Sequence, residues 1–254
     1  MCGRYTLHAE AEELMKRFGI VQLKVPVGPR YNIAPSQIVP VLTCDQAADR
    51  PGYVLDAYRW GFDSGPRALA KGPGLVINAR METLLERPMF KNLFLRNRCV
   101  IPANAFYEWD KVNAPKGGSR PYAINVSGGE LVGFAGLWRP ITGVTGAEKC
   151  FVIITVPSND KVSALHDRMP AILSPEAEKI WLDPECDDKA LLLSLLRPYP
   201  DPLVHLYPVS TMVNSTKIDS SECIAPAPPE SDVPAPKEKP SKPTQLSLFD
   251  ISAS

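Results

Sequence analysis

Short runs of β-branched and aromatic residues, each bounded by glycine or proline, recur along most of the chain. Runs of this kind are typical of β-strands, and the glycine pairs at 117–118 and 128–129 mark turns. The pattern predicts strands over Gly3–Leu7, Ala57–Phe62, Leu75–Asn78, Cys99–Ala103, Phe106–Asp110, Tyr122–Val126, Leu131–Leu137, Cys150–Val156 and Leu203–Pro208.

Helical periodicity is confined to a few segments. Ala9–Phe18 carries apolar side chains at helical spacing, Lys189–Leu196 is strongly apolar, and Glu82–Leu85 is a short candidate. Ser174–Trp181 begins with a capping serine and has proline in its first turn. Because strands and helices do not alternate regularly, a doubly wound sheet is not expected. We predict the α+β class, with an antiparallel, barrel-like β-sheet core and flanking helices.

The composition of the chain changes sharply near residue 224. Residues 225–243 carry seven prolines with scattered charges and almost no large apolar side chain. Such a stretch cannot bury enough surface to offset the entropy lost on ordering. We therefore predict one folded domain over residues 1–224, followed by a disordered proline-rich linker and tail over residues 225–254.

Charge and cysteine content narrow the functional classes. The chain has 28 basic and 28 acidic side chains, so a nucleic-acid partner would need a local cluster of arginine and lysine. The six cysteines form no C-x-x-C pair and fit no zinc framework. No metal and no organic cofactor are expected. The chain start lacks a secretory signal, and the longest apolar run, Cys150–Val156, is too short to span a bilayer. A cytoplasmic protein is expected.

Cys2 follows the initiator methionine, which is commonly removed before a small residue. Removal would leave an amine and a thiol on one residue, which can condense with an aldehyde to an imine and then close a thiazolidine ring. An α-amino group titrates near pKa 8 against about 10.4 for lysine, so at pH 7 its neutral fraction is roughly two-hundred-fold larger. Arg4 is expected to lower the pKa of the thiol. The alternative is that Cys2 is an accident of a disordered terminus.

Four further segments combine polar and aromatic side chains in patterns typical of a functional site. They are Tyr31–Gln37, Ile77–Thr83, Ala105–Trp109 and Leu165–Pro170. Together with Met1–Tyr5, they resemble in residues and order the SRAP (SOS response-associated peptidase) family, whose members recognise abasic DNA. The resemblance runs from Cys2 to about Pro208 and lacks no motif residue.

The resemblance implies catalytic roles for four residues. Cys2 corresponds to the residue that crosslinks, and Asn78, Glu108 and His166 correspond to the groups around the reacting sugar. The side chains suit these roles, because Glu108 can move the proton needed to open the sugar ring and His166 can shuttle a proton. Three of these residues also have a structural alternative. Asn78 could cap a helix, Glu108 could be a carboxylate at the rim that pairs with a basic side chain, and His166 could have a purely structural role.

The resemblance also implies a surface that binds single-stranded DNA. Its expected residues are Arg4, Asn32, Pro35, Arg80, Trp109 and Arg168. The arginines suit phosphate oxygens, and Trp109 can stack on a base or wedge beside the lesion, although alone it would more often be a core residue. The polar loop that contains Asn32 and Pro35 is expected to line the DNA groove.

These observations predict a sensor that forms a covalent thiazolidine crosslink through Cys2 with abasic sites in single-stranded DNA and protects them during replication. Strand cleavage by a lyase reaction and autoproteolysis are expected side activities. Two alternatives stay open. One is a cysteine peptidase with an N-terminal nucleophile, and the other is an adaptor that binds modified DNA without a covalent product. A monomer associated with the nucleoid is expected.

A short apolar segment, Gln245–Phe249, follows the proline-rich linker. It resembles the pentapeptide by which bacterial polymerases and repair proteins dock on the β sliding clamp. Leu246, Leu248 and Phe249 would enter apolar pockets, and Gln245 would form a hydrogen bond. The linker would then raise the concentration of the folded domain at the clamp. The alternative is a frayed terminus that carries these residues by chance.

Overall fold

The computed structural model describes residues 2–45, 52–63, 74–110, 118–141 and 148–227. The predicted clamp-binding segment, residues 245–249, lies outside the described residues, as does nearly all of the predicted linker. Among the helices of the described part, none has the length and apolar character needed to cross a membrane.

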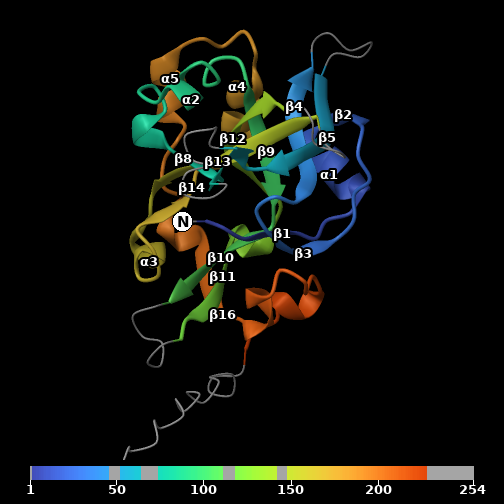
Figure 1. Ribbon diagram of the computed structural model, residues 1–254, viewed down its shortest axis with the longest axis vertical. Coiled ribbons are helices and arrows are strands. Elements are labelled where there is room, and N and C mark those ends of the chain that lie inside the picture. Colours follow the sequence, from blue (N-terminus) through green and yellow to red (C-terminus); the bar gives the residue numbers. More distant parts are fainter. Residues whose placement is uncertain (1, 46–51, 64–73, 111–117, 142–147, 228–254) are drawn as a thin grey trace, which may run out of the picture.

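Two sheets hold most of the strands (Figure 1). The smaller sheet is antiparallel. Its strand order is β16 (Val204–Pro208), β11 (Arg120–Val126), β10 (Ala105–Asp110), β1 (Tyr5–Leu7) and β3 (Arg30–Ile33).

The larger sheet closes into a barrel. Its strand order is β14 (Arg168–Pro170), β13 (Lys149–Pro157), β12 (Val132–Pro140), β9 (Arg98–Ala103), β4 (Ile38–Asp45), β5 (Gly52–Trp60) and β2 (Ile20–Leu23). β13 also pairs with β5, where Phe151 lies opposite Trp60, and this pairing closes the ring β13-β12-β9-β4-β5. The strands pack tightly, since a Cβ on Gly136 would lie 2.4 Å from Cδ1 of Ile101.

The predicted α+β class and barrel-like core are confirmed, but the large sheet is not wholly antiparallel. Parallel pairings join β13 to β5, β13 to β8 (Asn78–Arg80) and β2 to β5. Each joins segments that are far apart in the chain, so no local pattern of residues reveals it. The remaining short strands are β6 (Phe62–Asp63), β7 (Leu75–Val76) and β15 (Ile172–Leu173).

Short helices flank the barrel, as predicted. α1 (Ala11–Phe18) packs its apolar face into the core, and α4 (Pro175–Leu182) has the predicted Ser174 cap. The segment Glu82–Leu85, predicted to be a helix, instead begins within a 3-10 turn. The other helices are α2 (Pro88–Lys91), α3 (Asp160–Ser163), α5 (Lys189–Ser194), and the 3-10 helices η2 (Met81–Thr83), η3 (Ser127–Gly129), η4 (Asp201–Leu203), η5 (Thr211–Asn214) and η6 (Ser221–Cys223).

Strand β10 separates two apolar clusters, because successive side chains of a strand point to opposite faces. Phe106 contacts Phe134 of the barrel, with ring centroids 6.1 Å apart. Tyr107 packs instead in a second cluster with Val213 and other residues of the C-terminal segment, residues 209–224. Alternation therefore directs Glu108 to the barrel side and the next residue, Trp109, to the side of the C-terminal segment.

Candidate functional site

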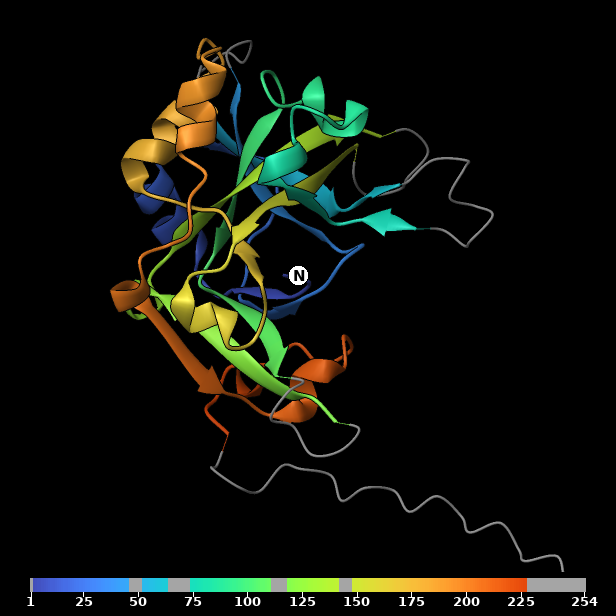
Figure 2. The ribbon, with the colours of Figure 1, turned by 90° about the vertical axis from the view of Figure 1, so that its left-hand side faces the viewer.

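The N-terminal segment passes between strands of the two sheets (Figures 1 and 2). On one side, the N–H of Tyr107 in β10 donates to the carbonyl oxygen of Arg4 at 2.9 Å. On the other side, Nδ2 of Asn78 in β8 donates to the carbonyl oxygen of Cys2 at 3.0 Å. These hydrogen bonds hold the backbone of Cys2 where β8 and β10 approach each other.

Asn78 is fixed by its strand, since β8 pairs with β13 and brings Asn78 opposite Ile153. It caps no helix, because the capping position of η2 belongs to Arg80. Its Oδ1 is buried and has no hydrogen-bond partner within the described part of the chain. A buried acceptor without a partner costs about 1–3 kcal/mol. This oxygen is therefore suited to accept a hydrogen bond from an amine or a sugar hydroxyl.

The side chain of Cys2 is completely buried. Burial raises the pKa of its thiol far above the ordinary value, and the charge of Glu108 raises it further. The pKa is therefore not lowered overall as predicted, because desolvation outweighs the effect of the hydrogen bond between the thiol and the Arg4 main chain, and the Arg4 guanidinium donates to Asn32 and Val213 instead. At neutral pH the thiol is protonated, so it cannot be the first nucleophile in this conformation.

Glu108 brings a buried carboxylate to the same place. Only 4% of the residue is exposed, and β10 holds it opposite Tyr122 of β11. Its effect on the pKa of Cys2 requires that the two side chains lie within electrostatic reach. Its burial shows that Glu108 does not lie on the rim of the site.

His166 lies between α3 and β14. The N–H of Arg168 donates to Nδ1 of His166 at 3.0 Å, so Nδ1 is an acceptor and Nε2 carries the proton of the neutral ring. The carboxylate of Asp167 also lies 2.8 Å from Nδ1, which would favour a proton there. A main-chain N–H can only donate, whereas the Asp167 side chain is 79% exposed and screened by water. The main-chain bond therefore sets the tautomer and leaves Nε2–H as a donor.

Strand β13 positions both His166 and Asn78. Its residue Thr155 pairs with Arg80 of β8 on one edge and with Pro170 of β14 on the other. Asn78 lies opposite Ile153 at the middle of β13, whereas His166 precedes β14, whose Arg168 lies opposite Pro157 at the end of β13. Of the two, Asn78 contacts Cys2.

Arg168 is buried and engaged within the protein. Its Nη1 and Nη2 donate to the two carboxylate oxygens of Glu82 at 2.6 and 2.9 Å, and Nη2 also donates to the carbonyl oxygen of Thr155. The predicted phosphate contact does not fit this arrangement, because both terminal nitrogens already have acceptors. Arg168 instead ties η2 to β13, while its main-chain N–H orients His166.

This ion pair predicts a pH-dependent contribution to stability. Hydrogen bonding from Arg168 lowers the pKa of Glu82, so the pair stabilises the fold above the ordinary glutamate pKa and loses this effect as the pH falls through the folded-state pKa. We expect Glu82→Gln to lower the free energy of unfolding at pH 7 by at most ~1 kcal/mol, since the Glu82 side chain is 43% exposed. In urea unfolding, the difference from the wild type should shrink below pH 4.

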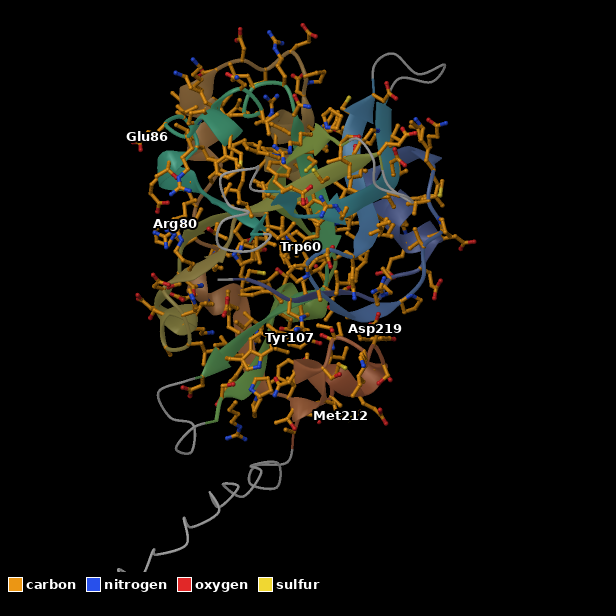
Figure 3. All side chains as sticks on the ribbon, viewed as in Figure 1. Trp60, Arg80, Glu86, Tyr107, Met212 and Asp219 are labelled. Atoms are coloured by element: carbon orange, nitrogen blue, oxygen red, sulfur yellow. The ribbon has the colours of Figure 1, made fainter. Side chains whose placement is uncertain are left out.

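The control for this measurement is Glu86→Gln, which replaces an exposed glutamate that Figure 3 shows at the periphery. It should follow the wild-type stability at every pH. A difference for Glu82→Gln that stays constant down to pH 3 would mean that the ion pair does not stabilise the fold through its charge.

Asn32 is also turned inward. It lies on β3 and is fully buried, and its Nδ2 donates to the carbonyl oxygens of Val213, Ser215 and Ile218. The prediction that Asn32 lines the DNA groove is wrong, because its side chain has no exposed surface. Its role is to connect β3 to the C-terminal segment.

The other predicted DNA-binding residues reach the surface to different extents. Pro35 is partly exposed in the turn after β3, and Arg80 is exposed at the periphery (Figure 3). Arg4 is half-buried, and its Nη1 donates to Oδ1 of Asn32 at 2.6 Å. Its guanidinium carbon lies 5.8 Å from the ring centroid of Trp109, so these two side chains form one stacked unit.

Three residues that shape the site were not found from the sequence. Glu82 lies within one of the recognised segments, but its partner Arg168 is 86 positions away. Asn214 and Asp219 contact Trp109 and β3 from the C-terminal segment, where no residue pattern marks them. Over the ranges that the structure describes, no group of three or more histidine, cysteine, aspartate or glutamate side chains could hold a metal ion.

The chain is similar to known proteins over most of its length. Residues 1–216 match the protein family described as SOS response associated peptidase (SRAP). Abasic site processing protein YoqW of Bacillus subtilis (strain 168) is 40% identical over 230 residues, which cover 88% of this chain and 99% of that protein. Abasic site processing protein YedK of Escherichia coli (strain K12) is 29% identical over 233 residues, covering 89% and 100% respectively.

The fold also matches a solved structure. A crystal structure of a protein from Bacteroides thetaiotaomicron superimposes with a TM-score of 0.73 at 23% sequence identity. The match covers 89% of this chain and 100% of that one, and it supports the α+β fold described above.

Proposed function

Since the chain belongs to the SOS response associated peptidase (SRAP) family, we propose that it captures abasic sites in single-stranded DNA as a covalent crosslink through Cys2. The names of its relatives support the substrate, because YoqW and YedK are both described as abasic site processing proteins. The observation that carries the proposal is the place of Cys2 between Asn78, which donates to its carbonyl oxygen, and β10, where buried Glu108 follows the residue that holds Arg4.

The proposal requires that Met1 be removed, so that Cys2 carries the α-amine. Because the buried thiol is protonated, the amine attacks first. Its nitrogen bonds to C1 of the ring-opened deoxyribose, and loss of one water leaves an imine. The Cys2 sulfur then bonds to C1, and the thiol proton is transferred to the imine nitrogen. The product is a thiazolidine, and one water is the only molecule lost.

The neighbouring side chains supply the proton transfers for these steps. An abasic sugar is mostly a closed hemiacetal, and Glu108 takes the proton of its C1 hydroxyl and delivers it to the ring oxygen as the bond between C1 and that oxygen breaks. Glu108 then accepts the thiol proton and delivers it to the imine nitrogen. Asn78 orients the amine through its buried Oδ1. The Nε2–H of His166 donates a proton to the departing hydroxyl as the imine forms, and the ring regains a proton from the amine nitrogen.

Two side activities would also use Cys2. An imine at C1 makes the proton at C2 acidic, so β-elimination can cleave the strand before the thiol closes the ring. Autoproteolysis would release the residue that precedes Cys2. Both depend on the chemistry at Cys2 rather than on a separate site.

Features of the surface around the site support a single-stranded substrate. Arg80 is exposed beside Asn78 in β8 and can meet phosphate oxygens, while the Trp109–Arg4 unit offers an aromatic face. A base stacked on such a face contributes about 1–3 kcal/mol. Pro35, partly exposed in the turn after β3, is proposed to belong to the same surface.

The direct test uses the wild-type protein and a single-stranded oligonucleotide that contains one uracil. After treatment with uracil glycosylase, the oligonucleotide should yield a slower band on a denaturing gel. The same oligonucleotide without glycosylase treatment, and one whose abasic site has been reduced with borohydride, should yield none. Absence of the slower band, or equal bands for all three oligonucleotides, would contradict the proposal.

Two further assays on the same protein separate the alternative functions, a cysteine peptidase and a non-covalent adaptor. A cysteine peptidase would turn over peptide substrates and need no DNA. A non-covalent adaptor would bind the abasic strand in a native gel but release it completely in denaturant.

We also propose that the tail docks on the bacterial β sliding clamp through Gln245, Leu246, Leu248 and Phe249. Two leucines and a phenylalanine after a proline-rich linker suit a peptide that enters apolar pockets. A peptide of residues 240–254 should bind purified clamp with micromolar affinity in a calorimetric titration. Replacing Leu248 and Phe249 with alanine should remove the binding. Absence of binding heat for the unchanged peptide at micromolar concentrations would contradict this proposal.

A further inference from the structure

A segment at the end of the described chain covers the face of the small sheet that points away from the barrel. This segment, residues 209–224, is called here the C-terminal strap. We propose that the strap positions the DNA-facing side chains and that its Asn214 is the residue that orients Trp109. The inference rests on the proposed function, because it assigns a purpose to the orientation of Trp109.

The strap is anchored on β3 by an aspartate. Oδ1 of Asp219 accepts hydrogen bonds from the main-chain N–H groups of Tyr31 and Asn32 at 2.6 and 2.8 Å, and its Oδ2 pairs with Arg30. Figure 3 shows Asp219 close to the small sheet, which also carries Tyr107. The carboxylate therefore satisfies main-chain donors at the edge of the sheet, which holds the strap in one place.

The buried amide of Asn32 fixes the turn of the strap. Its Nδ2 donates to the carbonyl oxygens of Val213, Ser215 and Ile218, at 3.2, 3.0 and 2.6 Å. These contacts lie on both sides of Asn214 in sequence. Asn214, the last residue of η5, is therefore held in place by its neighbours although it is itself exposed.

Asn214 and Arg4 hold Trp109 from two directions. Nε1 of Trp109 donates to Oδ1 of Asn214 at 2.6 Å. The Arg4 guanidinium lies over the indole at 5.8 Å, and its Nη1 donates to the carbonyl oxygen of Val213 at 2.7 Å. The residue before Asn214 thus holds Arg4, and Asn214 holds the ring on which Arg4 stacks.

The contacts with Asn214 and Arg4 fix the orientation of the partly exposed Trp109 ring. An indole held only by stacking can turn about the bond to its Cβ, whereas the hydrogen bond to Asn214 allows one orientation. A platform that is already oriented binds a base without further loss of side-chain freedom. Removing the acceptor should therefore weaken the binding of any single strand, including one without a lesion.

The expected result is that Asn214→Ala lowers the affinity for an undamaged single strand about fivefold, as loss of one hydrogen bond of ordinary strength would. Fluorescence anisotropy with a labelled oligonucleotide measures this without any crosslink. Thr216→Ala, at another exposed position of the strap, is the matched control and should bind as the wild type does. Equal affinity of Asn214→Ala and the wild type would overturn the inference.

A double-mutant cycle tests whether the effect passes through the indole N–H. Trp109→Phe keeps an aromatic ring but has no donor, so Asn214→Ala should have no further effect in that background. The same fivefold loss in both backgrounds would show that Asn214 acts on DNA by another route, and the inference would be wrong.

A measurement without DNA separates this inference from the proposed function. The indole N–H resonance of Trp109 is identified by its absence in Trp109→Phe. In Asn214→Ala it should shift and exchange faster with water, while the other indole resonances stay in place. An unchanged resonance would refute the positioning role. If instead the resonance changes but wild-type protein binds no single strand, the proposed function fails and the structural contact stands.

Discussion

Cys2→Ala is expected to lose the denaturant-resistant complex with abasic DNA completely, which on a gel means at least ~100-fold less product. Removal of Met1 from this variant would leave an α-amine on the substituted alanine, so an imine could still form. Without the sulfur the ring cannot close, and the imine hydrolyses in denaturant. Lysine side chains could not replace the N-terminal amine efficiently, since their neutral fraction at pH 7 is roughly two-hundred-fold smaller.

Borohydride distinguishes the roles of the amine and the thiol. Added during the reaction, it should reduce the imine of the Cys2→Ala variant and restore a stable band. Cys186→Ala is the matched cysteine control, because Cys186 is a partly exposed free thiol packed against the barrel core, and it should crosslink as the wild type does. A stable band for Cys2→Ala without reductant would show that the crosslink forms elsewhere.

Glu108→Gln is expected to slow crosslinking by roughly 100-fold or more, as loss of a general acid or base does. The substitution keeps the shape of a buried side chain and removes its ability to take a proton. Affinity for an undamaged single strand should stay within about twofold, because Glu108 is buried and lies on the barrel side of β10. Time courses on denaturing gels, together with anisotropy titrations, measure both quantities.

The pKa of Cys2 provides a second observable for the same variant. The Glu108 charge raises this pKa, so removing the charge should lower it, although burial will still hold it above the ordinary thiol value. Glu130→Gln, on the loop between β11 and β12, is the matched control and should leave the crosslinking rate unchanged. A Glu108→Gln protein that crosslinks at the wild-type rate would remove Glu108 from the chemistry.

The sequence predicted the strands with clean apolar patterns and missed those whose pattern is interrupted. β9, β10, β12 and β13 were predicted within a few residues of their observed bounds. β4 was missed because it contains Pro40, which usually argues against an inner strand. β4 pairs along its length with β5 but meets β9 only where Leu42 lies opposite Val100, so most of its length tolerates a proline.

The candidate site could be predicted as a set of residues but not as an arrangement. The motifs identified Cys2, Asn78 and Glu108, which the structure brings together. They could not tell which side chains point inward, and so Asn32 and Arg168 were predicted on the DNA surface. Their orientation depends on partners far along the chain, in the C-terminal strap and in η2, which only the folded chain brings near.

Intact mass spectrometry of the wild-type protein mixed with an abasic oligonucleotide tests the central claim most directly. We expect one new species, with the mass of the protein lacking Met1 plus that of the oligonucleotide, less one water. Proteolysis should then locate the added mass on the N-terminal peptide that begins with Cys2. An adduct that retains Met1, or one attached to any other peptide, would contradict the proposed chemistry.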